Sequence, residues 1–315
     1  MAAIVTITFN PCIDKSCYID ALVPDKKLRC TPFVNEAGGG GINVARAIKK
    51  LGSSALAVYL AGGYTGIVLR NSLQEEGVDA IAIDTGVDTR ENIMVTDKST
   101  HLQYRFITPG YAIQETHWRQ CLQAVEELNN MEYLVVSGSF QEGFPPDIFG
   151  RLSSIAKKKC AKLVIDIPAE AMQRYAVSDA YLLKPNLNEL SMLAGKEELH
   201  GDEIADAAKV IISRNICEVV LASMGAAGAL LVTKDITEQF TAPPVKRKST
   251  VGAGDSMLAG TVLYLHLKKS IREAVRFGIA CGTAATMNEG TQLCNRTEAE
   301  RLYRFITENN RPVLV

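Results

Sequence analysis

Two kinds of apolar pattern alternate along the chain. Short, continuously apolar segments rich in β-branched residues predict buried strands, and longer segments with apolar residues every three or four positions predict amphipathic helices. The expected strands cover residues 4–8, 55–60, 80–84, 133–137, 163–167, 181–184 and 219–222. The expected helices cover residues 42–51, 65–76, 113–130, 147–159 and 202–214. Because strands that alternate with helices form βαβ units, the pattern predicts an α/β fold with a mostly parallel sheet covered on both faces.

Three segments depart from this alternation. Residues 12–36 and 89–109 lack a helical period and alternate polar with apolar residues, so we expect them to form a small sheet apart from the main body. Residues 229–244 favour short antiparallel strands. No internal repeat or low-complexity linker interrupts the sequence, so a single domain over residues 1–315 is expected. The last third is mainly helical, and two capping boxes predict helix starts at Ser270-x-x-Glu273 and Thr297-x-x-Glu300.

Composition and charge narrow the classes of function. The 315 residues are 47% hydrophobic and 22% charged, which favours a sizeable core over disorder. Lys and Arg number 34 against 35 Asp and Glu, so charge does not indicate a nucleic acid or a membrane surface as a partner. None of the eight cysteines forms a CxxC pair, and the four histidines are scattered, which argues against a structural zinc site. No apolar stretch reaches the roughly 18 residues of a membrane span and no signal peptide is recognisable, so we expect a cytoplasmic protein with free thiols.

A glycine-rich segment at residues 249–257 precedes an apolar, helix-patterned run that ends near His266. Gly252 and Gly254 allow a tight turn that exposes backbone N–H groups, and the dipole of the following helix attracts anions there. Asp255 would compete with a resident anion, unless the anion is a phosphoryl group in transfer and Asp255 accepts the proton of the attacking hydroxyl. The alternative is an Asp that occupies an ordinary helix N-terminus.

A second glycine run, Gly38-Gly39-Gly40-Gly41, opens the helix that carries Asn43. Such a run lets a ligand approach the backbone closely, and the Asn43 amide can donate to and accept from sugar hydroxyls. The alternative is a flexible turn. Neither glycine segment matches the dinucleotide fingerprint, which argues against a nicotinamide oxidoreductase, and the absence of a Walker A sequence excludes a P-loop kinase.

Other polar residues follow expected strands, where open α/β sheets bind ligands. Asn186 and Glu189 lie one helical turn apart after Lys184-Pro185, an arrangement that suits Mg²⁺ held through water and substrate phosphates, or an ordinary capping box. Asp14 follows the first strand. Cations cluster in the two excursions, at Lys26, Lys27, Arg29, Arg90 and Arg105, where paired arginines could hold a phosphate or simply face solvent.

Together these motifs resemble the PfkB carbohydrate kinases of the ribokinase-like superfamily over essentially the whole chain. Residues 38–43 look like the N-terminal signature of the family and residues 249–257 like its C-terminal signature. Residues 27–31, 103–106, 243–246 and 288–291 look like the 6-phosphofructokinase group, to which 1-phosphofructokinases and tagatose-6-phosphate kinases are close relatives.

The resemblance implies a three-layer α/β/α sandwich with a mostly parallel central sheet and a small β-sheet lid, built by the excursions at 12–36 and 89–109, that also forms a homodimer. It implies phosphorylation of the C1 hydroxyl of fructose 6-phosphate by ATP with Mg²⁺ to give fructose 1,6-bisphosphate. Asp255 would be the general base, and the amides of Gly252, Ala253 and Gly254 the anion hole.

The same resemblance implies three sets of binding residues. Substrate-binding residues would be Asp14, Lys27, Gly39, Asn43, Arg90, Arg105 and Ser139. Nucleotide-binding residues would be Lys184, Asn186, Ser223, Gly225, Ser249 and Thr250. Glu189 would meet Mg²⁺ through water, and a monovalent cation such as K⁺ would lie near Ser249, Val251, Ala285, Asn288 and Gly290.

The sequence departs from the family pattern at residues 140–143, Phe-Gln-Glu-Gly, and at residues 166–168, Asp-Ile-Pro. Both lie near the expected substrate or nucleotide walls and away from Asp255. A tagatose-6-phosphate kinase and a 1-phosphofructokinase therefore remain alternatives, and a non-catalytic sugar-phosphate sensor is a third.

Overall fold

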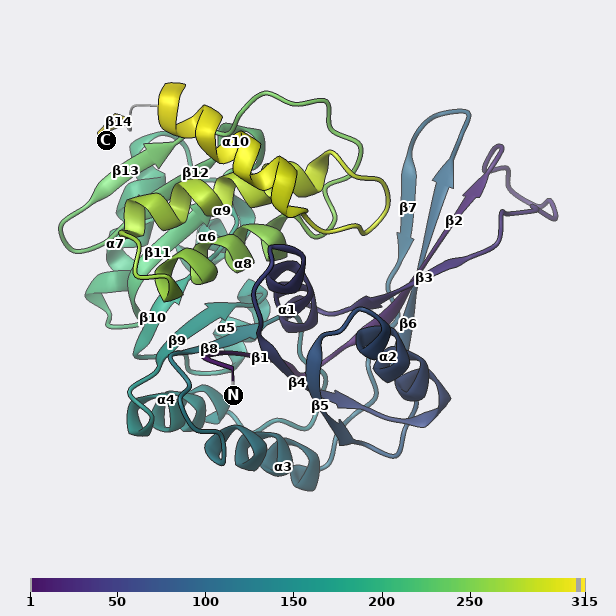
Figure 1. Cartoon of the computed structure of the whole chain (residues 1–315), viewed down its shortest axis with the longest axis horizontal. Helices are drawn as coiled ribbons and strands as arrows, with labels where there is room; N and C mark the ends of the chain where they lie inside the picture. The colour runs from purple at the N-terminus through teal and green to yellow at the C-terminus, as the bar shows by residue number, and fades with distance from the viewer. Residues whose placement is uncertain (1, 310–312, 315) are drawn as a thin grey trace.

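The main body is built on a twisted sheet with helices on both faces (Figure 1). The computed structural model describes residues 2–309 and 313–314. Within them ten strands follow the order β14-β13-β12-β11-β10-β9-β8-β1-β4-β5. The strands from β11 to β5 pair in parallel, and β12, β13 and β14 continue the sheet with antiparallel pairing. Their bounds are β1 Ile4–Thr8, β4 Leu56–Ala61, β5 Asp79–Asp84, β8 Tyr133–Ser137, β9 Lys162–Asp166, β10 Ala180–Leu183, β11 Cys217–Ser223, β12 Ala229–Val232, β13 Thr237–Phe240 and β14 Val313–Leu314.

Alternate residues of each central strand enter two separate cores. On β8, Tyr133 and Val135 belong to one buried cluster, while Leu134 and Val136 belong to the other. The first core is covered by α1 Gly40–Lys50, α2 Gly63–Glu75, α8 Ala253–His266, α9 Ile271–Thr286 and α10 Arg296–Asn309. The second is covered by α3 Glu115–Glu126, α4 Ile148–Lys158, α5 Ala169–Arg174, α6 Leu187–Leu193 and α7 Asp202–Ser213. The expected three-layer α/β/α architecture is therefore confirmed.

The two excursions form a second sheet that stands off the main body (Figure 1). Its strands are β2 Cys12–Ile19, β3 Val34–Gly38, β6 Arg90–Asp97 and β7 Gln103–Phe106, in the order β3-β2-β6-β7. Several large apolar side chains of this sheet and its loops are exposed: Leu22, Val23, Leu28, Phe33, Val34, Ile93, Leu102, Phe106 and Ile107. The small sheet predicted from residues 12–36 and 89–109 is thus confirmed, and we call it the lid.

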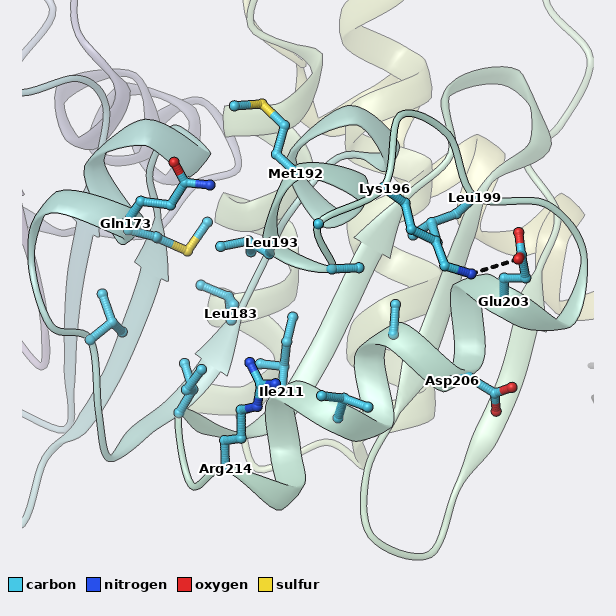
Figure 2. Close-up of a pocket in the computed structure, with 17 residues that line it drawn as sticks. Gln173, Leu183, Met192, Leu193, Lys196, Leu199, Glu203, Asp206, Ile211 and Arg214 are labelled. Atoms are coloured by element: carbon cyan, nitrogen blue, oxygen red, sulfur yellow. Dashed lines mark hydrogen bonds and ion pairs between the residues drawn. The ribbon is translucent and has the colours of Figure 1, made fainter.

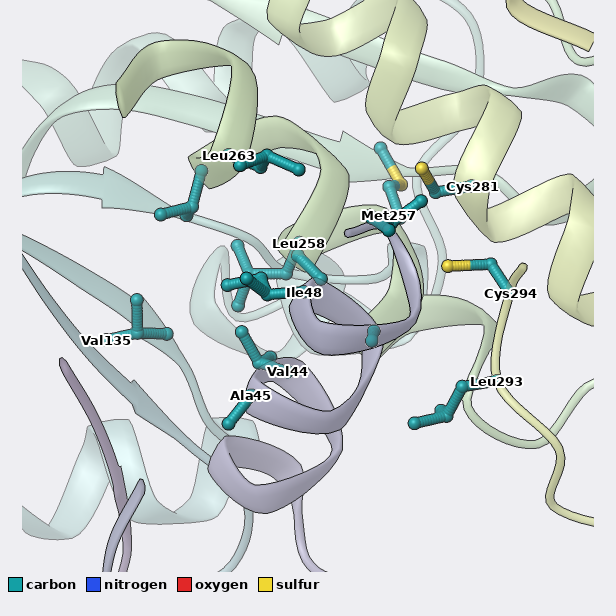
Figure 3. Close-up of a cluster of buried hydrophobic side chains, with 14 of the residues drawn as sticks. Val44, Ala45, Ile48, Val135, Met257, Leu258, Leu263, Cys281, Leu293 and Cys294 are labelled. Atoms are coloured by element: carbon teal, nitrogen blue, oxygen red, sulfur yellow. The ribbon is translucent and has the colours of Figure 1, made fainter. Parts of the chain in front are cut away.

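Helices α1 and α8 meet through apolar side chains beneath their polar ends (Figure 3). Val44 and Ile48 of α1 share the first core with Met257 and Leu258 of α8, and all but Met257 are fully buried. This packing fixes the N-terminal turns of the two helices beside each other. The two glycine-rich segments, which lie far apart in the sequence, therefore meet in space.

Most element boundaries lie within two residues of the sequence expectations, and the main differences are at two helices. The helix expected over residues 113–130 is α3, which covers only Glu115–Glu126. The capping box at Ser270 and Glu273 is confirmed, whereas the one expected at Thr297 and Glu300 is wrong. Asn295 caps α10 instead, because its Oδ1 accepts the Glu298 N–H at 3.0 Å, and the helix begins before Thr297. In the described part of the chain, no helix is long and apolar enough to cross a membrane.

Candidate active site

Asp255 lies in the first turn of α8 and receives a hydrogen bond from α1. Asn43 Nδ2 donates to Asp255 Oδ2 at 2.9 Å. Burial, with the neighbouring Asp166 charge, raises the pKa of Asp255 to about 6, although the Asn43 hydrogen bond and the Lys184 charge oppose this. A carboxylate with this pKa is ionised near neutral pH and is still basic enough to accept a proton, as a general base requires.

Lys184 brings a buried positive charge to the same place. It directly follows β10, its side chain is 5% exposed, and its Nζ lies 3.0 Å from Asp166 Oδ1 at the end of β9. Burial lowers the pKa of Lys184, but the charge and hydrogen bond of Asp166, together with the charges of Glu189 and Asp255, hold that pKa above its usual value. A Cβ at Gly254 would stand 3.4 Å from Nζ, so the absence of a side chain there leaves the ammonium group open to the first turn of α8.

The turn before α8 depends on a glycine. Gly252 has φ +72° and is the N-cap of the helix, and a Cβ there would lie 2.7 Å from Leu293 Cδ2. The Ala253 N–H reaches the Thr250 carbonyl only at 3.5 Å. Backbone N–H groups in a first helical turn have no intrahelical acceptor, so this turn can bind an anion beside Lys184 and Asp255.

Asp14 and Arg90 extend the site onto the lid strands β2 and β6. They are joined by Asn92, whose Nδ2 donates to Asp14 Oδ1 at 2.8 Å and whose Oδ1 accepts from Arg90 Nη1 at 3.1 Å. A pocket of about 190 Å³ opens here, lined by Cys12, Asp14, Gly39, Arg90, Asn92, Ile93, Met94, Arg105, Ile107, Val251 and Thr291. One pocket thus offers a carboxylate for hydroxyl groups and guanidinium groups for a phosphate.

Arg90 retains hydrogen-bonding capacity for a ligand. Its Nη1 and Nη2 donate to the carbonyl oxygens of Thr108 and Asn10, each at 3.1 Å, while its Nε is buried without a partner among the described residues. Asn10 also donates through Nδ2 to Ser139 Oγ at 3.1 Å, which places Ser139 after β8 beside the arginine. Because an unpaired buried N–H is costly, the Nε group favours an acceptor supplied from outside.

Asn186 and Glu189 form the capping box of α6. Asn186 Oδ1 accepts the Glu189 N–H at 2.9 Å, and Glu189 Oε2 accepts the Asn186 N–H at 2.8 Å. The pair therefore caps the helix, as the alternative interpretation of the sequence held. The capping does not exclude a role toward Mg²⁺. Burial raises the pKa of Glu189 against the effect of the Asn186 N–H, so a cation nearby would stabilise its ionised form. Ser223 is linked to this segment, because its N–H donates to the Pro185 carbonyl at 2.8 Å, and Gly225 opens the short 3₁₀ turn that follows.

Two loops meet where the monovalent cation is expected. Ser249 Oγ donates to the Gly290 carbonyl at 2.7 Å and accepts the Val251 N–H at 3.2 Å. Asn288 Nδ2 donates to the Leu293 carbonyl at 2.9 Å, and the Ala285 carbonyl accepts the Asn288 N–H at 3.1 Å. All five expected residues therefore belong to one pair of adjoining segments, and carbonyl oxygens are suitable ligands for such an ion.

Lys27 is not brought to this pocket. It lies exposed in the loop between β2 and β3 and is not among the lining residues, so its substrate role stays a prediction. Arg105 lines the pocket from β7, where Gln103 Oε1 accepts its Nε and Nη2 groups at 3.2 and 3.0 Å.

Sequence reasoning assigned no role to Asp166 or Asn92. Asp166 is the last residue of a strand whose interior is fully apolar, and ligands bind at the carboxyl ends of such strands. Its position in the sequence could therefore have identified it as a candidate site residue. Asn92 is two residues from Arg90 on a strand and therefore shares its face.

Phe140 of the divergent 140–143 turn packs among Phe9, Phe144, Phe149 and Tyr175, with ring centroids 5.1 to 5.5 Å from it.

A further cavity of about 720 Å³ opens between α5, α6 and α7 (Figure 2). Its walls are mainly apolar and include Leu183 and Ile211, and Lys196 pairs with Glu203 at 2.6 Å in the same lining. None of its lining residues is a candidate site residue. The chemistry expected from the sequence thus gathers at the carboxyl ends of the parallel strands instead.

Comparisons with known proteins show the family of the chain. The model of the pfkB family carbohydrate kinases matches residues 7–298. Over 308 residues the chain is 40% identical to ATP-dependent 6-phosphofructokinase isozyme 2 of Escherichia coli, covering 98% of this chain and 100% of that protein. A crystal structure of phosphofructokinase-2 from Escherichia coli in complex with potassium is similar with a TM-score of 0.93 at 40% identity, covering 98% of this chain and 100% of that one. A structure of that enzyme in complex with fructose-6-phosphate gives a TM-score of 0.89 at 37% identity, with the same coverage.

Proposed function

The chain is an ATP-dependent carbohydrate kinase of the pfkB family, and we propose that it phosphorylates fructose 6-phosphate at the C1 hydroxyl to give fructose 1,6-bisphosphate. The observation that carries the proposal is the position of Asp255, which Asn43 holds in the first turn of α8 beside the buried Lys184. A non-catalytic sensor would need the anion-binding turn but not a carboxylate with a raised pKa inside it.

The reaction requires one proton transfer and one phosphoryl transfer. Asp255 takes the proton from the C1 hydroxyl, the sugar oxygen forms a bond to the γ-phosphorus, and the bond from that phosphorus to the leaving ADP breaks. The amides of Gly252, Ala253 and Gly254, with Lys184, stabilise the charge on the transferring group. Mg²⁺ bound to ATP supplies further positive charge, and Glu189 is the residue of this chain suited to meet it through water.

We propose a phosphorylated sugar as the substrate because the pocket at the lid offers one set of groups for sugar hydroxyls and another for a phosphate. Asp14, Gly39 and Asn43 would bind the sugar hydroxyls, since Asp14 and Gly39 line this pocket and Asn43 contacts Asp255. Arg90, with Arg105 and Ser139, would bind the 6-phosphate, since Arg90 and Arg105 line the pocket and offer guanidinium groups to it. The name of the 40% identical relative supports this substrate.

Two further features belong to the proposal. The exposed apolar side chains of the lid would be covered by the lid of a second copy, which gives a homodimer. The segments around Ser249 and Gly290 would hold a monovalent cation such as K⁺, as the potassium complex of the relative suggests.

A tagatose-6-phosphate kinase and a 1-phosphofructokinase are the alternatives within the family. All three would share the Asp255 chemistry. Tagatose 6-phosphate differs from fructose 6-phosphate in the configuration at C4, which the residues that bind the sugar hydroxyls would distinguish, whereas fructose 1-phosphate carries its phosphate at the opposite end of the sugar. An ADP-release assay with the competing sugar phosphates separates them, because the proposal requires the highest kcat/KM on fructose 6-phosphate.

A further inference from the structure

Arg46 is a buried arginine at the centre of the α1–lid junction. It lies on α1, one turn after Asn43, and is only 3% exposed. Glu76, at the end of α2, accepts its Nε at 3.0 and 2.9 Å and its Nη2 at 2.7 Å. Glu36 of the lid strand β3 lies 3.8 Å from Nη2. Two carboxylates thus neutralise and orient the guanidinium group.

The remaining nitrogen of Arg46 makes two contacts. Nη1 donates to the Ala37 carbonyl of β3 at 2.5 Å and to Asn43 Oδ1 at 3.3 Å. An amide has its acceptor and its donor on opposite sides, so a donor at Oδ1 determines where Nδ2 points. In this structure Nδ2 points to Asp255, at 2.9 Å.

We propose that Arg46 is a positioning residue that holds the Asn43 amide with its Nδ2 toward Asp255 and ties this orientation to lid strand β3. This inference rests on the proposed function, because the role of Asp255 as base comes from there. If the amide turned over, Asn43 Oδ1 would face the carboxylate and repel it. Arg46 itself need not touch the sugar or the nucleotide.

The groups around Asp255 determine whether loss of the Asn43 hydrogen bond raises or lowers the pKa of Asp255. Besides Asn43 from α1, the groups that act on it are Asp166 from β9, Lys184 after β10, and Asp14 and Cys12 from β2. Donation from Asn43 stabilises the ionised carboxylate, so loss of that bond raises the pKa of Asp255 further. The acidic limb of the kcat/KM profile would then move to higher pH.

Arg46→Lys tests the proposal, because it keeps the positive charge and removes the fork that reaches Glu76, Ala37 and Asn43 together. The expected result is a rise of about one unit in the acidic pKa of kcat/KM. Arg272→Lys is the matched control: Arg272 Nε binds both oxygens of Glu238 at 2.9 Å, the same bidentate geometry, on α9 and β13 away from the site. This control should leave the acidic pKa unchanged.

Glu76→Gln provides a second variant in case Arg46→Lys does not fold, since Glu76 is 29% exposed and its replacement is mild. It should shift the acidic pKa in the same direction by roughly 0.3 units. A titration of the Asp255 carboxyl by ¹³C NMR, assigned through Asp255→Asn, reports the same shift without turnover. If the wild type has no kinase activity but the NMR shift is present, the proposed function fails and the role of Arg46 stands. If Arg46→Lys and Glu76→Gln lose only melting temperature and the pKa of Asp255 stays at its wild-type value, the role of Arg46 is wrong.

Discussion

Asn43 of α1 and Asp255 of α8 are joined by a hydrogen bond of 2.9 Å, although 212 positions separate them in the sequence. The bond connects the two glycine-rich segments that carry the family resemblance. It also joins a group expected to bind a sugar hydroxyl to the group expected to remove a proton from one. In the proposed reaction this bond links the residue that binds the sugar to the residue that accepts its proton.

Replacement of the base is the first prediction. Asp255→Asn keeps the size of the side chain and removes its basicity, so kcat should fall roughly 10²- to 10⁴-fold. Binding of the sugar phosphate, measured by calorimetry, should change far less. Asp147→Asn is the control, because Asp147 is an exposed carboxylate paired with Arg151 on α4. Similar turnover in both variants would contradict the assignment of Asp255.

The pKa of Asp255 predicts a pH dependence. The base must be ionised, and its pKa is raised to about 6, so kcat/KM should decline about tenfold per pH unit below about pH 6. Above that value the profile should be flat until another group titrates. A limb that stays near pH 4 would mean that Asp255 is as acidic as an exposed carboxyl group.

The phosphate end of the pocket gives a prediction on affinity. Arg90→Ala should raise the KM for the sugar phosphate at least tenfold and the KM for ATP much less, because Arg90 lines the lid pocket and its guanidinium group can bind a phosphate. Asn92→Ala should act in the same direction, since it releases both Arg90 and Asp14. Arg119→Ala, at an exposed arginine that pairs with Glu115, serves as the control. Equal losses for both substrates would indicate a misfolded lid.

Adding one methyl group at Gly252 should lower the stability of the protein. Gly252→Ala forces a φ of +72° on an L-residue and brings its Cβ against Leu293, so about 1–3 kcal/mol of stability should be lost. The melting temperature should fall by several degrees, and kcat should fall because the anion-binding turn moves. Gly150→Ala in α4 is the control: a Cβ at this position would meet nothing within 4 Å, so the substitution should be neutral or stabilising.

The exposed apolar side chains of the lid predict self-association. Phe106→Glu on β7 places a charge among them and should shift the protein from dimer to monomer in sedimentation velocity experiments. Tyr64→Glu, at a more exposed aromatic residue on α2, should leave the association state unchanged. A wild-type monomer at micromolar concentration would refute the lid-mediated dimer.

Much of the fold could be predicted from local pattern. The strands around Tyr133 and Leu163 are short and largely apolar because both of their faces are buried, and such segments are recognisable without any tertiary information. The start of α10 could not be predicted in the same way, because Asn295 and Thr297 are both good capping residues. Which of two nearby caps is used depends on packing of the helix rather than on the motif.

The site was predictable where glycine and charge occur together in one segment, as at Gly252 and Asp255. It was not predictable where a residue acts through a partner distant in sequence. Arg46 occupies an ordinary helical position and is important only because Glu76 and Asn43 converge on it. Asp166 likewise gains its role from Lys184, which lies on a neighbouring strand end.

The most direct test of the central claim is a coupled ADP-release assay with ATP and Mg²⁺. Fructose 6-phosphate, tagatose 6-phosphate and fructose 1-phosphate are compared side by side, and the Asp255→Asn variant is assayed under the same conditions. We expect the highest kcat/KM on fructose 6-phosphate and loss of that activity in the variant. Absence of turnover with all three sugars, or turnover that survives in Asp255→Asn, would contradict it.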